Sequence, residues 1–337
     1  MNVAINGFGR IGRAVFKAIL EKKSKIKIVA INDLTDIATL AHLLKYDSCY
    51  GAYNKKVNFT KDSLIVGGRK YKVLAEKKPR HLPWKGLDVD VVLECTGLFR
   101  AKKEAREHLK AGAKKVIISA PYKGEIKVKT IVLGVNEDKL NKKDDIISMA
   151  SCTTNCLAPV TEVIRRNFGI KKAIMTTIHS YTADQRIVDG PHKDLRRARA
   201  AAVNIIPTTT GAAIATTNTI PSLKNKFDGM AIRVPTPIAS ITDVVYLTTR
   251  NTTEKKVNLA FKKAARSARL KNILAVSSEP LVSTDFIGNP ASAIVDLNLT
   301  KVVDSNLLKV VAWYDNEWGY SSRMADLVEY MGRKRFV

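Results

Sequence analysis

Hydrophobic residues recur along the first half of the chain in short runs that alternate with stretches of helical period. Residues 3–6, which open with three apolar side chains, predict a short buried strand, and apolar positions from Ile11 to Leu20 then recur with the period of a helix. The same patterns predict the further elements of this half, namely strands over 26–31, 89–95, 116–119 and 130–135, a polar hairpin region over 57–73 and a helix over 102–111. This alternation is typical of a doubly wound α/β domain, which we expect to span residues 1–150.

A second pattern begins near residue 150. An apolar strand over 146–150 leads into an amphipathic stretch that begins at Cys152, and another strand over 173–179 follows. The long polar and basic segment 180–201 comes next. Loops of this length inside a compact protein usually carry function or form an interface.

Alternating strands then recur as far as Val311. They predict an α+β domain with a mixed, largely antiparallel sheet over residues 151–317. Residues 321–331 have the pattern of an amphipathic helix. We expect the C-terminal segment 318–337 to pack back onto the first domain.

Length and composition narrow the class of protein. At 337 residues the chain exceeds the usual length of a single core, so two domains are the expected arrangement. No stretch approaches the roughly 18 uncharged apolar residues of a membrane span, and the first residues lack the features of a signal peptide. Four scattered cysteines match neither a secreted disulfide framework nor a zinc site. We therefore expect a cytoplasmic protein with no membrane partner and no metal.

The formal net charge of +26 is unusual for a protein of this size. Attraction to nucleic acid or to anionic metabolites is one explanation. The lysines are spread along the whole chain, however, and aromatic residues are not interleaved with them as in stacking platforms for nucleic acid. We therefore favour a solvated basic surface over a nucleic-acid-binding one.

The first strand runs into a glycine motif, Gly-Phe-Gly-Arg-Ile-Gly at residues 7–12, in the strand–turn–helix context of a dinucleotide-binding fold. Such glycines let the backbone turn tightly and approach a pyrophosphate at the helix N-terminus. Asp33 follows the next strand, 21 residues after Gly12, where a carboxylate binds the adenosine ribose and repels a 2′-phosphate. Thr96-Gly97 and Ser119 also end strands, where ligands bind in open parallel sheets. These features favour NAD.

Residues 151–156, Ser-Cys-Thr-Thr-Asn-Cys, lie where a predicted strand turns into a predicted helix. Unpaired N–H groups and the helix dipole favour negative charge there, so we expect a lowered pKa for the Cys152 thiol. Ser151 is expected to cap the helix. A disulfide between Cys152 and Cys156 is rejected because residues four apart on a helix hold their Cβ atoms roughly 5–6 Å apart, whereas a disulfide needs about 3.8 Å. Most free cysteines are inert, so a nucleophile here requires a base.

His179 is the expected base, because it ends a strand in the same predicted domain as Cys152. A Cys–His pair beside a nicotinamide indicates aldehyde oxidation, in which the thiolate attacks an aldehyde, a hydride leaves, and a second nucleophile cleaves the thioester. His179 then takes the proton of the substrate hydroxyl. We interpret the other histidines as structural, namely His42, His81, His108 and His192.

Hydroxyl, backbone N–H and guanidinium groups cluster near the cysteine and histidine segments, without nearby carboxylate clusters. Arginine binds phosphate in a bidentate way. We therefore expect two anion sites, one for a phosphate on the substrate and one for attacking inorganic phosphate. The candidate residues are Ser151, Thr153, Thr182, Arg197, Thr210, Gly211 and Arg233.

Over essentially its whole length the chain resembles the phosphorylating glyceraldehyde-3-phosphate dehydrogenases. Residues 4–13 are similar to the family's opening, and residues 150–159, Ala-Ser-Cys-Thr-Thr-Asn-Cys-Leu-Ala-Pro, resemble its active-site signature. Further similar segments are 179–182, 194–199, 208–213, 233–237 and 313–321. The resemblance implies NAD-dependent oxidative phosphorylation of D-glyceraldehyde 3-phosphate to 1,3-bisphosphoglycerate, a step of glycolysis and gluconeogenesis.

The resemblance also implies a role for individual residues. Cys152 becomes the acylated nucleophile and His179 its base. The implied ligands of the substrate phosphate are Thr182, Asp184, Arg197 and Arg233, and those of the attacking phosphate are Ser151, Thr153, Thr210 and Gly211. The implied cofactor-binding residues are Gly7, Gly9, Arg10, Ile11, Gly12, Asp33, Lys77, Thr96, Gly97, Ser119, Asn316 and Tyr320. The family is homotetrameric, and loop 180–201 is implied to reach a neighbouring subunit's cofactor.

Two departures from the family pattern bear on the cofactor and the site. Gly190-Pro191 stands where bacterial NAD-dependent members usually carry Leu-Pro, and Ile214 replaces a common lysine. With Asp33 intact we favour NAD, while NADP use stays open. Three alternatives also stay open: erythrose-4-phosphate dehydrogenase activity, nucleic-acid binding by the basic surface, and redox sensing by Cys152.

Overall fold

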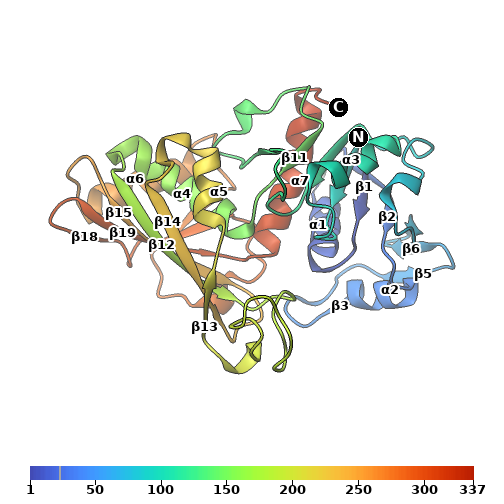
Figure 1. Ribbon diagram of the computed structural model, residues 1–337, viewed down its shortest axis with the longest axis horizontal. Coiled ribbons are helices and arrows are strands. Elements are labelled where there is room, and N and C mark those ends of the chain that lie inside the picture. The colour runs from blue at the N-terminus through green and yellow to red at the C-terminus, as the bar shows by residue number, and fades with distance from the viewer. Residues whose placement is uncertain (23) are drawn as a thin grey trace. The chain divides into compact units, whose positions relative to one another are not determined.

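The computed structural model describes residues 1–22 and 24–337 and separates into two compact units, whose elements are labelled in Figure 1. Unit 1 comprises Met1–Ile131, Asp138–Ala150 and Ser321–Val337, and unit 2 comprises Val132–Glu137 and Ser151–Tyr320. Within the described ranges, no helix is long and apolar enough to cross a membrane.

Unit 1 is built on a nine-stranded sheet with the order β10-β11-β9-β8-β1-β2-β7-β6-β5. Neighbouring strands from β10 to β7 run parallel, and β7, β6 and β5 pair antiparallel at one edge. This arrangement confirms the predicted Rossmann-type fold. The elements are β1 (Asn2–Asn6), α1 (Arg10–Glu21), β2 (Lys27–Asn32), α2 (Ile37–Lys45), β3 (Tyr46–Asp47), β4 (Gly51–Ala52), β5 (Val57–Phe59), β6 (Ser63–Val66), β7 (Arg69–Leu74), β8 (Val91–Glu94), α3 (Lys102–Lys110), β9 (Lys115–Ile118), β10 (Lys129–Thr130) and β11 (Ile146–Ser148).

The strand predicted over 130–135 is wrong for most of its length. Only β10, Lys129–Thr130, pairs with β11. The chain then turns, because the Val132 N–H donates to the Asn136 side chain at 2.8 Å and the Val135 N–H donates to the Val132 carbonyl. The apolar side chains of Val132 and Val135 are buried in the core of unit 2 instead of joining the ladder.

Unit 2 contains an eight-stranded sheet in the order β13-β14-β12-β15-β19-β17-β16, with β18 paired to β19. Two of its strand pairs, β12/β14 and β16/β17, are parallel and the others are antiparallel, which confirms a mixed, largely antiparallel sheet. The elements are α4 (Cys152–Phe168), β12 (Lys172–Ser180), β13 (Ile206–Thr209), α5 (Ala212–Thr219), β14 (Phe227–Val234), β15 (Ser240–Leu247), α6 (Glu254–Arg266), β16 (Leu274–Ser277), β17 (Ala293–Asp296), β18 (Lys301–Val303) and β19 (Leu307–Tyr314). A last helix, α7 (Trp318–Arg333), begins in unit 2 and ends in unit 1.

Helix α4 is fixed at its start and along one face. The Ser151 Oγ accepts a hydrogen bond from the Thr154 N–H at 3.1 Å, which confirms Ser151 as the N-cap. Leu157, Val160 and Ile164 are buried in the same hydrophobic core as residues of the sheet. Burial of this apolar stripe holds the first turn of the helix, and with it Cys152, in place.

Strand register brings distant residues together in unit 2. On the parallel pair β12/β14, His179 stands opposite Arg233. On the antiparallel pair β15/β19, Ser240 stands opposite Tyr314. Because side chains on neighbouring strands share a face at matched positions, this register determines which groups surround His179.

The close approach of β12 and β14 can be tested at Gly229. A Cβ atom at this position would lie 2.4 Å from the Met175 carbonyl oxygen. We therefore expect Gly229→Ala to lower the free energy of unfolding by about 1–3 kcal/mol in urea titrations. Gly190→Ala is the control, because its Cβ would have its nearest neighbour at 3.7 Å. Equal stabilities of the two variants would contradict the described packing.

Candidate functional site

Cys152 and His179 face one another in unit 2. Cys152 is the first residue of α4, and His179 lies one residue before the end of β12. The Cys152 Sγ is 3.5 Å from the His179 Nε2. The cysteine is half-buried and the histidine only 4% exposed, so the pair has limited access to water.

The hydrogen bonds of His179 select its tautomer. Its Nδ1 lies 2.7 Å from the Ser180 carbonyl oxygen, which can only accept, and 3.0 Å from the Arg233 Nη1, which can only donate. The Ser180 contact is the shorter one and the Arg233 Nη1 donates to the same carbonyl, so we assign the proton to Nδ1, and Nε2 presents its lone pair to the thiol. Burial and the neighbouring charge of Arg233 lower the pKa of His179 to about 3. The imidazole is therefore neutral at neutral pH, and its Nε2 lone pair is free to take a proton.

The expected lowering of the Cys152 pKa is contradicted. Burial raises the pKa of the thiol, and the charge of Arg233 and hydrogen bonds from Thr153 offset this only in part. Loss of hydration outweighs the favourable position at the helix N-terminus. The structure thus describes a neutral thiol facing a neutral base, so the proton leaves Sγ for Nε2 as the sulfur attacks.

Tyr314 on β19 is a residue of the site that the sequence reasoning did not single out. Its hydroxyl lies 3.0 Å from the Thr153 Oγ1 and 2.9 Å from the Thr177 Oγ1. Its ring packs edge-on against the His179 ring, with the centroids 6.0 Å apart. Tyr314 therefore braces both the start of α4 and the imidazole. The sequence does contain one indication of this role, because Tyr314 occupies an inward-facing position of a strand with alternating side chains.

Arg233 joins the histidine to the loop after β12. Its Nη1 donates to the Ser180 carbonyl at 2.9 Å and lies 3.4 Å from the Thr182 Oγ1. Within the described chain, its buried Nε has no hydrogen-bond partner. Burial and the charge of Arg197 both lower the pKa of Arg233, so two guanidinium groups repel one another here. A bound dianion would relieve that repulsion.

Arg197 is held by more acidic groups than the sequence reasoning expected. It forms ion pairs with Asp184 and, at 3.6 Å, with Asp194. Its Nε also donates to the Thr208 Oγ1 at 2.9 Å. The expectation of a cluster without carboxylates is therefore wrong for Arg197, although the carboxylates fix its orientation.

Other predicted residues of unit 2 stand apart from this contact set. Thr210 and Gly211 precede α5, and in the described residues no hydrogen bond joins them to the Cys152–His179 pair. Asn316 is buried, and its Oδ1 accepts hydrogen bonds from the Ser180 and Ser240 hydroxyls. Tyr320 is buried in α7.

Unit 1 contains a cavity of about 990 Å³ beside the carboxyl ends of its parallel strands. Five of the predicted cofactor-binding residues line it, namely Gly7, Gly9, Asp33, Lys77 and Thr96. Other predicted residues of this unit do not line it, namely Arg10, Ile11, Gly12, Gly97 and Ser119. The Arg10 guanidinium instead pairs with Asp47 at 3.2 Å.

The glycines at this cavity fit a dinucleotide. A Cβ on Gly12 would lie 2.1 Å from the Gly7 carbonyl oxygen, so the turn closes only without side chains. At Gly9, by contrast, a Cβ would meet nothing within 4 Å, which leaves a space that a pyrophosphate can enter at the N-terminus of α1. Asp33 is fixed at the cavity wall by the N–H groups of Phe8 and Thr35.

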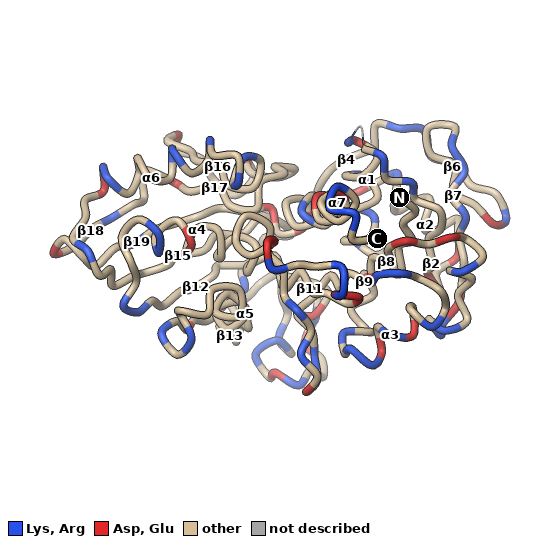
Figure 2. Tube along the Cα trace, turned by 90° about the horizontal axis from the view of Figure 1, so that it is seen from above, with Lys and Arg blue, Asp and Glu red and all other residues tan. Residues whose placement is uncertain are grey.

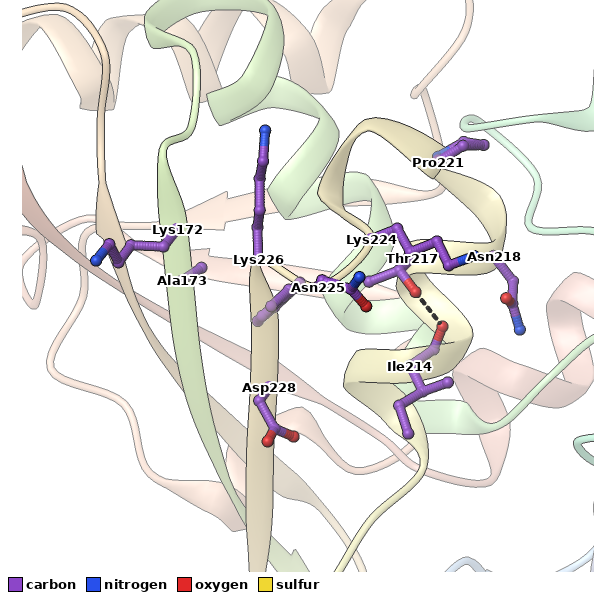
Figure 3. Close-up of a pocket in the computed structure, with 11 residues that line it drawn as sticks. Lys172, Ala173, Ile214, Thr217, Asn218, Pro221, Lys224, Asn225, Lys226 and Asp228 are labelled. Carbon is purple, nitrogen blue, oxygen red and sulfur yellow. Dashed lines mark hydrogen bonds between the residues drawn. The ribbon is translucent and has the colours of Figure 1, made fainter.

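A second hollow, of about 680 Å³, lies between α5 and the starts of β12 and β14. Figure 3 shows that the side chains of Lys172 and Lys226 on its wall point in different directions. None of the predicted site residues lines it. Its lysines do not converge on a common point, so it is not a candidate site for the chemistry above.

Comparison with known proteins gives the same result for both halves of the chain. The family model "Glyceraldehyde 3-phosphate dehydrogenase, NAD binding domain" matches residues 1–102, and the model of the C-terminal domain matches residues 151–316. The chain belongs to the glyceraldehyde-3-phosphate dehydrogenase family.

Relatives within this family match nearly the whole chain. The glyceraldehyde-3-phosphate dehydrogenases of Streptomyces coelicolor and Geobacillus stearothermophilus are each 54% identical over 335 residues, 99% of either chain. A Bacillus subtilis relative, glyceraldehyde-3-phosphate dehydrogenase 2, is 52% identical over 336 residues, 99% of this chain and 97% of its own. The resemblance found in the sequence motifs is thus confirmed, including an NAD-binding domain.

The role of His179 as base can be tested through the reactivity of Cys152. We expect His179→Asn to slow alkylation of Cys152 by iodoacetamide at neutral pH by about tenfold or more, because the variant removes the imidazole nitrogen that lies 3.5 Å from the thiol. Mass spectrometry of the Cys152 peptide measures the rate. His81→Asn, an exposed histidine of unit 1, is the matched control and should react as the parent chain does. An unchanged rate in His179→Asn would refute the assignment.

Proposed function

We propose that this chain oxidises and phosphorylates D-glyceraldehyde 3-phosphate to 1,3-bisphosphoglycerate, with hydride transfer to NAD through a thioester on Cys152. The observation that carries this proposal is the neutral His179 Nε2, 3.5 Å from the Cys152 sulfur, in a chain of this dehydrogenase family. We assign dinucleotide binding to residues 1–150 with the C-terminal helix, and substrate chemistry to residues 151–317.

The first step is attack of the Cys152 sulfur on the aldehyde carbon. His179 Nε2 takes the thiol proton as the carbon–sulfur bond forms, and then gives it to the former carbonyl oxygen. The product is a thiohemiacetal. The Ser180 carbonyl keeps the Nδ1 proton in place throughout, so Nε2 remains the only ring nitrogen that exchanges protons with the substrate.

Oxidation of the thiohemiacetal requires removal of a hydride and a proton from the same group. NAD, when bound, accepts the hydride. His179 Nε2 takes the hydroxyl proton, which leaves a thioester on Cys152. The residues that would hold NAD in unit 1 are Gly7, Gly9, Arg10, Ile11, Gly12, Asp33, Lys77, Thr96, Gly97 and Ser119. Asn316 and Tyr320 are proposed to contact the nicotinamide.

An oxygen of inorganic phosphate then attacks the thioester carbon, and the carbon–sulfur bond breaks. Cys152 leaves as a thiolate and recovers the proton held on His179. We place the substrate phosphate with Thr182, Asp184, Arg197 and Arg233, since an anion relieves the repulsion between the two arginines. We place the attacking phosphate with Ser151, Thr153, Thr210 and Gly211, the first of which caps the same helix that carries Cys152.

A homotetramer in the cytoplasm is part of this proposal. In the loop after β12, Ile187, Val188 and Leu195 are 72–83% exposed, which is unusual for large apolar side chains in a monomer. A contact between subunits would bury them. Sedimentation should give the mass of four 37.2 kDa chains, and a monomer at all concentrations would overturn this part.

The basic residues do not favour a second function. Figure 2 shows Lys and Arg along the traces of both units. This spread resembles a general solvated surface more than a nucleic-acid groove. Nucleic-acid binding is therefore not part of the proposal.

The proposal is tested by following reduced nicotinamide in the full-length enzyme with glyceraldehyde 3-phosphate, with NAD or NADP, and with or without inorganic phosphate. We expect turnover that requires phosphate and prefers NAD, because Asp33 faces the cavity where a 2′-phosphate would have to enter. Turnover that ignores phosphate would favour thioester hydrolysis, and a preference for erythrose 4-phosphate would favour the sister enzyme. Either result would contradict the proposal.

A further inference from the structure

A buried carboxylate lies behind the dinucleotide cavity of unit 1. Glu94, the last residue of β8, is 1% exposed. Its Oε1 accepts hydrogen bonds from the Thr96 N–H, at 2.8 Å, and from the Thr96 hydroxyl. Its Oε2 accepts one from the Asn6 side chain at 2.6 Å. Among the described residues, no lysine or arginine forms an ion pair with it, so hydrogen bonds alone must satisfy this group.

His108 on α3 supplies a further hydrogen bond, and its tautomer can be assigned. The Trp84 indole N–H, which can only donate, lies 3.0 Å from the His108 Nδ1. Nδ1 therefore carries no proton, and the N–H at Nε2 donates to the Glu94 Oε2 at 3.0 Å. Trp84 and His108 are fully buried. The indole, the imidazole and the carboxylate form one directed chain of hydrogen bonds.

This chain continues to the cavity wall through two asparagines. The Asn6 Oδ1 accepts from the Asn32 Nδ2 at 2.7 Å. Asn32 in turn exchanges two hydrogen bonds of 2.9 Å with the backbone of Glu76. Asn6 directly precedes Gly7, and Asn32 directly precedes Asp33. The network therefore ties together the ends of β1, β2 and β8, which carry the cavity-lining residues.

Glu94 and His108 do not themselves line the cavity, whereas Asn6, Asn32, Glu76 and Thr96 do. We propose that the Glu94–His108 pair is a positioning device for NAD, which acts by fixing the backbone at the ends of β1, β2 and β8. This inference rests on NAD binding by unit 1. It assigns to His108 a role beyond packing.

The test compares NAD affinity, measured by calorimetry on the full-length protein, with turnover at saturating NAD. Glu94→Gln keeps the shape but places an amide N–H₂ against neighbouring donors. We expect it to raise the Kd for NAD about tenfold, because buried donors lose their acceptor. Turnover at saturating NAD should stay within about twofold, since the reacting groups belong to unit 2.

Substitution of His108 provides an independent variant with a rescue. His108→Phe removes the donor to Glu94 and should also weaken NAD binding. His108→Gln can keep an N–H near the place of Nε2 and should restore most of the affinity, which a role in filling space alone does not predict. The double variant Glu94→Gln, His108→Phe should lose less NAD affinity than the sum of the two single losses, because both residues act through one chain of hydrogen bonds.

Val92→Ala is the matched control. It truncates a fully buried side chain on the same strand, outside the network, and should lower stability without changing the Kd for NAD. The proposal is overturned if folded Glu94→Gln and His108→Phe bind NAD as the parent does, or if Val92→Ala weakens binding equally. Failure of the parent chain to bind NAD would instead overturn the proposed function.

Discussion

The hydrogen bond between the His179 Nδ1–H and the Ser180 carbonyl is the contact on which the chemistry of unit 2 depends. It determines which ring nitrogen is free, and that nitrogen faces the Cys152 sulfur at 3.5 Å. Burial and Arg233 keep the imidazole neutral, since both lower its pKa. If Nδ1 lost this acceptor, the proton could move to Nε2, and the ring would face the thiol with a donor instead of a lone pair. The catalytic pair is thus defined by a backbone group that no substitution of a side chain can remove directly.

In both units, buried polar contacts hold backbone segments in place at the end of a sheet. In unit 2, the register of β12 with β14 sets Arg233 beside His179, and Tyr314 bridges Thr153 and Thr177. In unit 1, the Glu94 carboxylate accepts hydrogen bonds from Thr96, Asn6 and His108. Buried polar groups of this kind are costly unless every partner is present, so they favour a single arrangement of the loops around them. The ligand-binding segments themselves can then remain glycine-rich and open.

The sequence predicted the parallel and mixed sheets, the helix that begins at Cys152 and the cap at Ser151, because these follow from local periodicity and turn chemistry. The strand prediction failed over residues 130–135, because Val132 and Val135 are buried in the hydrophobic core of unit 2. Periodicity alone does not indicate which core an apolar run joins. The sequence also predicted a lowered pKa for Cys152. Helix position is visible in a sequence, but the extent of burial that raises this pKa is a property of the folded chain. Tyr314 was missed because its partners Thr153 and Thr177 are distant in sequence, and Glu94 was missed because its burial and its contact with Asn6 arise only in the folded sheet. The family match confirms the general activity, while the roles of most single residues stay predictions.

The central proposal is that Cys152, and not Cys156, carries the acyl group. His179 accepts and donates the protons of each step. Mass spectrometry of the full-length enzyme after mixing with glyceraldehyde 3-phosphate and NAD, without inorganic phosphate and with acid quenching, tests this most directly. We expect a phosphoglyceroyl adduct on the Cys152 peptide, its disappearance when phosphate is added before the quench, and no adduct in Cys152→Ser. An adduct on Cys156, or none on a chain that nevertheless reduces NAD, would contradict it.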